Sequence, residues 1–263
     1  MVDNLHQLTS VYGPVKSWRY GRSLGIDPIG SISTCSFNCV YCQLGEIQHH
    51  TTERQLFIPT EKISRDLQAF APWEVDVITL SGSGEPTQAL NLREILTQVK
   101  QLTGRKTVVL TNSTFLGDAG VRSALDLADI VAAKLDAVSS EQLRRINRPA
   151  PEIDWYGIIS NLTQFRQEYR GHLAIQTMIL SPWSFEAQAE YTRLMQRVMP
   201  DEIQLNTPTR PRSLSRQMET RGNHTQNLPY PVQNLKHVSP NILRELATQI
   251  QTSTGIVVRC PPL

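Results

Sequence analysis

Strand-like and helix-like segments alternate along most of this chain, and that alternation limits the folds open to it. Several of the strand-like segments are apolar almost throughout, which is typical of strands buried on both faces of a parallel sheet. We therefore predict an α/β fold built from consecutive strand–helix units. The expected strands are 29–34, 75–81, 106–111, 129–135, 173–180 and 202–207, with a last strand-like run at 256–260.

Helical segments with recognisable starts separate the expected strands. Residues 154–169 carry apolar side chains at helical spacing, and Asn91 with Glu94 has the spacing of a capping box. Ser239 followed by Pro240 predicts the start of a last helix that ends near residue 252. The residues expected to stand at the other helix starts are Thr60, Asn91, Asp118 and Ser184.

The number of strand–helix units bounds the architecture. Six units are too few for a closed eight-stranded barrel, so a partial barrel or an open sheet is expected. In either fold the reactive groups belong at the C-terminal ends of the strands. We expect an irregular, basic N-terminal extension over residues 1–25, the barrel over 26–210, and a C-terminal extension over 211–263 with a loop, a helix and a strand.

Composition excludes few functions, but it indicates the size of the core and the cellular compartment. With 263 residues, 40% hydrophobic and 19% charged, the chain can bury a sizeable core. A net charge of +2 permits a nucleic-acid or phosphorylated partner without arguing for one. No apolar run approaches the roughly 20 residues of a membrane helix, and the N-terminal segment lacks the apolar core of a secretory signal. We therefore expect a cytoplasmic protein that does not bind a membrane.

Three cysteines carry the strongest chemical signal. Cys35, Cys39 and Cys42 have the spacing C-x3-C-x2-C, and such a cluster in a reducing compartment indicates a metal site. Thiolates suit zinc and iron–sulfur clusters alike. Three thiolates on a four-iron cluster leave one iron without a protein ligand, where a cofactor or substrate can bind. A structural zinc site would usually add a second Cys or His pair at its own short spacing, and the sequence contains none.

The remaining candidate ligands are weaker. His49 and His50 form a tandem pair downstream of the cysteines, and such a pair is more often exposed than ligating. Cys260 lies far away in the expected terminal strand, where a small buried apolar side chain is the simpler role. The spacing of the three clustered cysteines thus favours an iron–sulfur cluster.

The segment CSFNCVYC, with Tyr41 before its last cysteine, resembles the signature of the radical S-adenosylmethionine (SAM) superfamily. The stretches YGPVKSWRYGRSLGIDPI, SGSGEPT and NTPTRP are similar to the branch of the tRNA wyosine-forming enzymes and their bacterial relatives of unassigned function. The resemblance extends from about Tyr12 to Arg210. The additional cysteine set of the wyosine-forming enzymes is missing here.

The resemblance implies a partial (β/α)6 TIM-like barrel with a 4Fe–4S cluster and SAM as cofactors. It further implies that the cluster reductively cleaves SAM to a 5′-deoxyadenosyl radical that abstracts hydrogen from a substrate. The substrate class stays open between a small molecule, a peptide and a tRNA base. An external electron donor of the flavodoxin or ferredoxin type is also implied.

The resemblance also implies which residues contact SAM. The turn Gly82-Ser83-Gly84-Glu85 is expected at the SAM amino group, since glycines allow close approach and a carboxylate accepts hydrogen bonds from an ammonium. Tyr41 is expected to contribute its backbone to adenine contact. Polar residues in or after the later strands are the other candidates, namely Asn112, Ser113, Lys134, Asp136, Gln176 and Asn206.

Basic residues flank the expected mouth of the barrel. They could bind a phosphate or an RNA backbone, or they could be solvated loop charges. Arg22, Arg148 and Arg210 are the candidates for substrate contact. The other basic residues of the two flanking segments are Lys16, Arg19, Arg212, Arg216 and Arg221.

Two other classes of function compete with a radical enzyme. One is a non-catalytic iron–sulfur electron carrier or regulator, which has no need for an open iron or a SAM-binding turn. The other is a zinc-stabilised α/β binding protein. Metal analysis separates the zinc protein from the other two.

Overall fold

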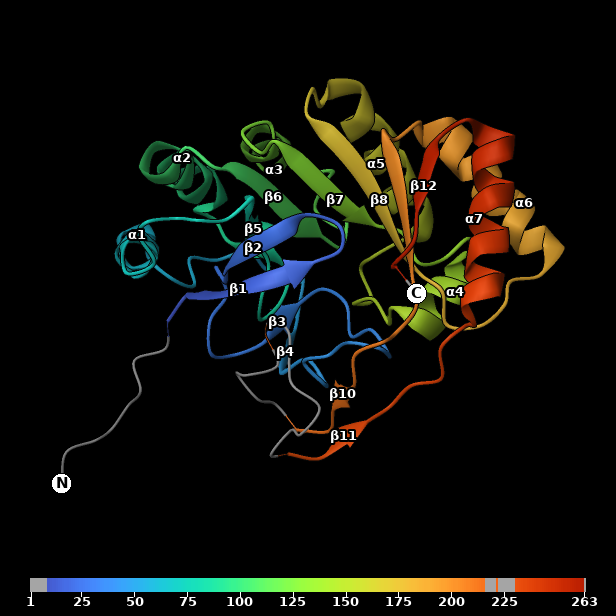
Figure 1. Ribbon diagram of the computed structural model, residues 1–263, viewed down its shortest axis with the longest axis horizontal. Coiled ribbons are helices and arrows are strands. Elements are labelled where there is room, and N and C mark those ends of the chain that lie inside the picture. The colour runs from blue at the N-terminus through green and yellow to red at the C-terminus, as the bar shows by residue number, and fades with distance from the viewer. Residues whose placement is uncertain (1–8, 216–220, 222–229, 263) are drawn as a thin grey trace.

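The computed structural model describes residues 9–215, 221 and 230–262, and one curled sheet organises them (Figure 1). This eight-stranded sheet has the order β1-β2-β5-β6-β7-β8-β9-β12. Its parallel strands are β2 (Gly21–Ile26), β5 (Val77–Leu80), β6 (Lys106–Thr111), β7 (Ile130–Lys134), β8 (His172–Met178), β9 (Glu202–Asn206) and β12 (Val257–Arg259), and β1 (Val11–Ser17) pairs antiparallel with β2. The predicted partial (β/α)6 TIM-like barrel is confirmed.

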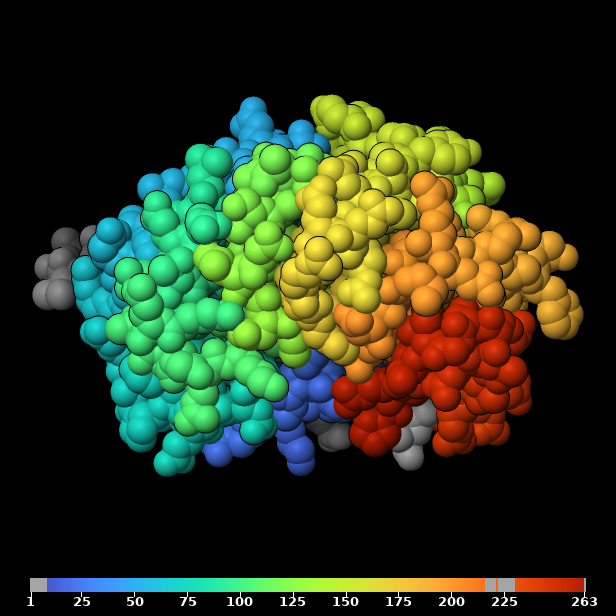
Figure 2. Space-filling view, turned by 90° about the horizontal axis from the view of Figure 1, so that it is seen from above, coloured from blue at the N-terminus to red at the C-terminus, as the bar shows by residue number. Residues whose placement is uncertain are grey.

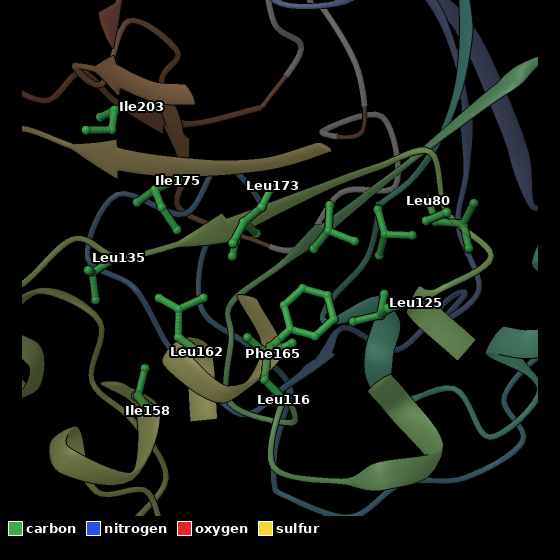
Figure 3. Close-up of a cluster of buried hydrophobic side chains, with 14 of the residues drawn as sticks. Leu80, Leu116, Leu125, Leu135, Ile158, Leu162, Phe165, Leu173, Ile175 and Ile203 are labelled. Carbon is green, nitrogen blue, oxygen red and sulfur yellow. The ribbon is translucent and has the colours of Figure 1, made fainter. Parts of the chain in front are cut away.

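Helices cover the outer face of this sheet in chain order, as the colours of Figure 2 show. In Figure 3, Phe165 and Leu162 from one helix lie among Leu173, Ile175 and Leu80 from the strands. Fully burying side chains of this size stabilises the fold by about 2 kcal/mol each. The helices are α1 (Thr60–Gln68), α2 (Leu92–Thr103), α3 (Ala119–Leu125), α4 (Ser140–Ile146), α5 (Trp155–Glu168), α6 (Phe185–Val198) and α7 (Pro240–Thr254), with a 3-10 turn η1 at Pro86–Gln88.

Most predicted helix starts are confirmed, because the capping side chains accept backbone hydrogen bonds as expected. Asp118, Asp154, Ser184 and Ser239 each accept from a backbone N–H three residues further on. The helix over Ser140–Ile146 was not expected from the sequence.

The predicted capping box at Asn91 is wrong. The Asn91 amide donates to the Ile58 carbonyl (3.0 Å) and to Thr60 Oγ1 (2.9 Å) instead of capping α2. Thr60 is the first residue of α1, following Pro59, and its hydroxyl donates to Glu94 (3.1 Å). These residues join the starts of α1 and α2, and this cross-helix contact takes the place of the local cap.

The N-terminal prediction needs the largest correction. Within residues 1–25, which were expected to be irregular, lie β1 and most of β2, the first parallel strand. Of the strand expected at 29–34, only Thr34 is in a strand, the two-residue β3 (Thr34–Cys35) beside β4 (His49–His50). The chain turns after β2 because the Asp27 carboxylate accepts from the backbone N–H groups of Ile29 and Gly30 (3.0 and 3.1 Å).

The β1–β2 turn bridges the open side of the barrel. The Tyr20 hydroxyl donates to Gln204 of β9 (3.3 Å). Arg259 of β12 donates to the carbonyls of Trp18 (3.3 Å) and Arg19 (3.4 Å). Both sequence extensions therefore contribute strands to the main sheet, and they meet each other across its opening.

Smaller features complete the description. Cys260 follows β12 and is partly buried against the core, while His49 and His50 are exposed as expected. The C-terminal extension, expected to begin with a loop, contains the short pair β10 (Arg212–Ser213) and β11 (Val232–Gln233). Among the described helices, none has the length and apolarity needed to cross a bilayer.

Candidate active site

A cavity of about 430 Å³ lies between the sheet and the loops that follow its strands. Its volume is in the range of pockets that bind small molecules and cofactors. Most residues predicted for the site line it. They are Cys35, Cys39, Tyr41, Cys42, Gly82, Gly84, Glu85, Asn112, Lys134, Gln176, Asn206 and Arg210.

The three clustered cysteines lie on one short segment that begins at the end of β3, and none of them forms a disulfide. Burial raises the pKa of Cys39 to about 12, and burial followed by the nearby Glu85 carboxylate raises the pKa of Cys35 well above its usual value. The thiols of Cys35 and Cys39 are therefore protonated at neutral pH unless a cation stabilises the thiolates. Iron supplies such a charge, so the donor set fits an iron–sulfur cluster.

The cysteine segment is hydrogen-bonded to the last residue of α4 and to the two residues after it. Val40 N–H donates to the Ile146 carbonyl (2.9 Å), and Asn38 N–H donates to the carbonyls of Asn147 (3.0 Å) and Arg148 (3.1 Å). In the described part of the chain, no three His, Cys, Asp or Glu side chains converge as the ligands of a single metal ion do. In a four-iron cluster each thiolate binds a different iron, so the three sulfurs need not converge.

Two buried amides donate to sulfur atoms of this segment. Asn112 Nδ2 lies 3.5 Å from Cys35 Sγ, and Asn147 Nδ2 lies 3.4 Å from Cys39 Sγ. Hydrogen bonds to the sulfurs are among the factors that set the potential of an iron–sulfur cluster. Sequence reasoning missed Asn147 and chose its neighbour Arg148, which is exposed, does not line the cavity and has φ +46°.

The glycine-rich turn is joined to the cysteine segment through Thr34. Thr34 N–H donates to the Ser83 carbonyl (3.1 Å), and Glu85 N–H donates to the Thr34 carbonyl (3.0 Å). A Cβ on Gly84 would lie 1.7 Å from that same Thr34 oxygen, so the approach requires glycine. Ser83 does not line the cavity, because its buried hydroxyl donates to Asp27 (2.6 Å).

Glu85 is buried at the wall of the cavity and is held by its own neighbours. One carboxylate oxygen accepts from the Thr87 hydroxyl (2.6 Å) and N–H (3.1 Å), and the other accepts from Asn112 N–H (2.6 Å). Burial raises the pKa of Glu85, and these hydrogen bonds partly oppose the rise. The carboxylate therefore fixes the start of η1 and the end of β6 as well as facing the cavity.

Two predicted site residues after the strands lie behind the cavity wall. Ser113, at φ +75°, is buried and donates to the Lys134 carbonyl (2.9 Å). Asp136 is buried and accepts from the Tyr41 hydroxyl, from Asn147 Nδ2 (2.7 Å) and from Met178 N–H (2.8 Å). Both residues position others, and the structure does not bring them to the cavity.

The basic residues likewise divide into those that line the cavity and those that do not. Arg22 is exposed and does not line the cavity, whereas Arg210 lines it and donates to Gln43 (3.1 Å). Lys16, Arg19 and Arg221 also line it, Arg212 does not, and Arg216 lies outside the described residues.

Sequence reasoning missed the hairpin side of the cavity, formed by Tyr12, Trp18 and Tyr20. Gly13 lies within β1 and Gly21 begins β2, both at positive φ, and these glycines were the available signal for a hairpin.

Comparison with known proteins agrees with this geometry. The model of the radical SAM superfamily matches residues 29–182, more than half of the chain. The UPF0026 protein slr1464 of Synechocystis sp. is 57% identical over 257 residues, which cover 97% of each chain.

Two crystal structures of Streptococcus suis SuiB share the fold. One, bound to the precursor peptide SuiA, has a TM-score of 0.63 at 16% identity, covering 90% of this chain and 48% of SuiB. The other, bound to SAM, has a TM-score of 0.60 at 16% identity, covering 88% and 48%. This chain thus spans about half the length of SuiB. The family match decides the assignment: the chain belongs to the radical SAM superfamily, whose members use a 4Fe–4S cluster and SAM.

Proposed function

We propose that this protein is an enzyme that holds a 4Fe–4S cluster on Cys35, Cys39 and Cys42 and binds SAM beside it. When bound, the cluster supplies the electron that breaks the sulfonium C–S bond of SAM, giving methionine and a 5′-deoxyadenosyl radical that abstracts hydrogen from a substrate. The observation that carries the proposal is that one cavity joins the three thiols and the glycine-rich turn, with Thr34 linking both.

The cavity wall offers groups suited to the polar parts of SAM. The backbone of Gly82 and Gly84 lies at the cavity wall, where the close approach of Asp27 and Thr34 requires glycine, and Glu85 presents a carboxylate. Asn206 Oδ1 is buried and has no hydrogen-bond partner among the described residues, although Asn206 lines the cavity. A buried acceptor without a partner is costly, so a ligand N–H is the expected donor. Gln176 lies on the same wall.

Other predicted residues serve the site indirectly in this proposal. Asn112 and Asp136 position the cysteine segment, since their polar groups bond to Cys35, Tyr41 and Asn147. Lys134 lies with its Nζ 5.2 Å from the centre of the Tyr41 ring and faces the cavity.

The electron donor and the substrate are molecules separate from this protein. We propose an external donor of the flavodoxin or ferredoxin type, because a radical enzyme of this kind needs one electron for each cleavage. A non-catalytic electron carrier would use the same cysteines. It would have no use for a ligand-sized cavity beside them, which favours the enzyme.

The test is substrate-independent cleavage of SAM. Anaerobically reconstituted protein is reduced in the presence of SAM, and 5′-deoxyadenosine and methionine are measured together with iron and sulfide. We expect 5′-deoxyadenosine from the wild type and from Cys260→Ala, whose cysteine does not line the cavity. Cys39→Ala should reduce the product to background.

Two results would contradict the proposal. A confirmed and fully reduced four-iron cluster without 5′-deoxyadenosine would indicate the carrier or regulator. Stoichiometric zinc in place of iron and sulfide in protein purified without oxygen would indicate the zinc-stabilised binding protein.

A further inference from the structure

The amide of Asn147 is buried beside the cysteine segment but outside the cavity. Asn147 follows the last residue of α4, and only 1% of its surface is exposed. Its backbone is held on both sides, because its N–H donates to the Leu143 carbonyl (2.8 Å) and its carbonyl accepts from Asn38 N–H (3.0 Å). The side-chain amide therefore acts on neighbouring protein groups and not on bulk water or on a ligand in the cavity.

Asp136 determines which way this amide points. One oxygen of the Asp136 carboxylate accepts from Asn147 Nδ2 (2.7 Å) and from the Tyr41 hydroxyl. An ionised carboxylate only accepts hydrogen bonds, so the reversed amide would bring the Asn147 oxygen against a second acceptor. The contact with Asp136 thus keeps the NH₂ group of Asn147 on the side of the amide that faces the cysteine segment.

The same NH₂ group reaches the sulfur of a cysteine, since Asn147 Nδ2 lies 3.4 Å from Cys39 Sγ. A thiol sulfur is a weak acceptor, whereas hydrogen bonds to an ionised acceptor are about twice as strong as those between neutral groups. The contact is therefore strongest when Cys39 is a thiolate, which is its state as a ligand of iron. The position of Asn147 suits the cluster-bound protein better than the free thiol.

Asn112 makes a similar but less separable contact. Its Nδ2 lies 3.5 Å from Cys35 Sγ and 2.8 Å from the Ser36 hydroxyl. Asn112 also lines the cavity, so a substitution there would change the wall of the proposed SAM site as well. Asn147 does not line the cavity, and its effect on the cluster can be measured apart from SAM.

We propose that Asn147 is a positioning residue that raises the reduction potential of the cluster through its N–H···S bond to Cys39, and that Asp136 fixes its amide for this contact. Reduction adds one electron, supplied by the proposed external donor, and increases the negative charge on the sulfur ligands. A hydrogen-bond donor on the sulfur stabilises the reduced state more than the oxidised state. Asn147 keeps its protons throughout, and no covalent bond forms or breaks at it.

This inference rests on the proposed function, because it takes Cys39 to be a ligand of the cluster. It adds a residue that sets how strong a reductant the external donor must be. A cluster with a higher potential is reduced by a weaker donor, so the N–H···S bond would widen the range of donors that can start the reaction.

The experiment measures the reduction potential of the reconstituted cluster without SAM. The protein is titrated anaerobically in the presence of redox mediators, and the reduced cluster is followed by electron paramagnetic resonance. Asn147→Ala removes the donor, and Asn147→Leu removes it with less change of volume. We expect both variants to lower the ratio of reduced to oxidised cluster at a fixed potential at least threefold, which is a shift of about 30 mV for one electron.

Two further variants separate the potential from stability. Asn147→Gln keeps an NH₂ group and should lie closer to the wild-type potential than Asn147→Ala. The matched control is Asn91→Ala. Asn91 is also buried, its Nδ2 also donates to two acceptors, and its Oδ1, like that of Asn147, has no hydrogen-bond partner among the described residues. Asn91→Ala should lose a similar free energy of unfolding and keep the wild-type potential.

The outcomes separate this inference from the proposed function. A wild-type potential in both Asn147→Ala and Asn147→Leu, or an equal shift in Asn91→Ala, overturns the role of Asn147. Loss of the cluster from both variants while Asn91→Ala retains it also overturns that role, because Asn147 would then build the segment and not set the potential. In these cases 5′-deoxyadenosine from the wild type shows whether the proposed function still stands.

The reverse combination is equally informative. A lower potential in both Asn147 variants supports the inference even if the wild type forms no 5′-deoxyadenosine. A wild type that takes up no iron and sulfide overturns this inference and the proposed function together.

Discussion

The two ends of the barrel both carry acidic side chains, but they use them differently. At the N-terminal ends of the strands, Asp76, Asp129 and Asp201 each stand directly before a strand and accept from a backbone N–H of the neighbouring strand, at 2.7, 2.7 and 2.8 Å. These carboxylates are exposed or half-buried, and two of them also pair with Lys100 or Arg166.

At the C-terminal ends the acidic side chains are buried. Asp27, Glu85 and Asp136 follow β2, β5 and β7, and each accepts from loops and side chains of the site. When a hydrogen-bond partner is lost, water can replace it at the N-terminal ends of the strands, where the carboxylates are accessible, but not at the C-terminal ends, where they are buried. The comparison teaches that one end joins strands to each other, while the other fixes the loops that build the cavity.

Glycines give the sharpest contrast between the ends. Gly84→Ala places a Cβ 1.7 Å from the Thr34 carbonyl oxygen, and we expect it to lower the free energy of unfolding by more than about 3 kcal/mol. Gly104, which precedes β6 at the opposite end, has no atom within 4 Å of an added Cβ. Its φ of +60° makes Gly104→Ala cost about 1 kcal/mol. Urea unfolding of both variants measures the difference, and equal losses would contradict it.

A carboxylate-to-amide change at the buried end should have the next largest effect. One oxygen of Asp136 accepts from Met178 N–H, and the other accepts from Asn147 Nδ2 and the Tyr41 hydroxyl. In Asp136→Asn the new NH₂ faces a donor in either orientation. We expect a loss of about 2–3 kcal/mol in unfolding free energy. The incorporated iron should also fall, because Asn147 donates to Cys39.

The iron content separates two explanations of that loss. A matched variant, Asp201→Asn at the N-terminal end, should keep the wild-type iron content. Asp201 accepts hydrogen bonds from Arg166 of α5 and Leu173 of β8, which do not contact the cysteine segment. If both variants lose iron equally, the loss reflects general instability and not the cysteine segment.

The sequence predicted the regular part of this fold well. Strands buried on both faces are apolar runs, and capping side chains such as Ser184 act through their own helix, so both signals are local. The first strand lacked such a signal, because β2 contains Gly25. A Cβ there would lie 2.3 Å from the Tyr12 ring, so a tertiary contact with β1 requires this glycine.

Residues of the site were predicted where the spacing of residues in the sequence determines the chemistry. They were missed where the packing of distant segments determines it. The cysteine spacing predicted the three thiols that line the cavity. It could not show that Asn147, which is 108 residues beyond Cys39, would donate to that sulfur. Likewise, nothing local distinguishes Asn206, which faces the cavity, from Ser113, which is turned to the Lys134 carbonyl.

The smallest expected effect comes from Asp129→Asn at the N-terminal end. Burial alone would raise the pKa of Asp129, but hydrogen bonds from Thr107 and Lys100 outweigh it and lower the pKa. A lowered folded-state pKa means that the carboxylate stabilises the fold fully above its unfolded value, about 3.9, and loses this contribution as the pH falls further. Because the group is about one-third exposed, with 35% of its side-chain surface accessible, solvent screening keeps the cost of the substitution at pH 7 below about 1 kcal/mol.

The pH dependence makes this prediction specific. The difference in unfolding free energy between wild type and Asp129→Asn should be constant from pH 7 to about 5 and should shrink as the pH falls below about 4. Urea unfolding across this range measures it. A difference at pH 7 as large as that of Asp136→Asn would mean that water does not replace the lost partner. The proposed distinction between the two ends of the barrel would then fail.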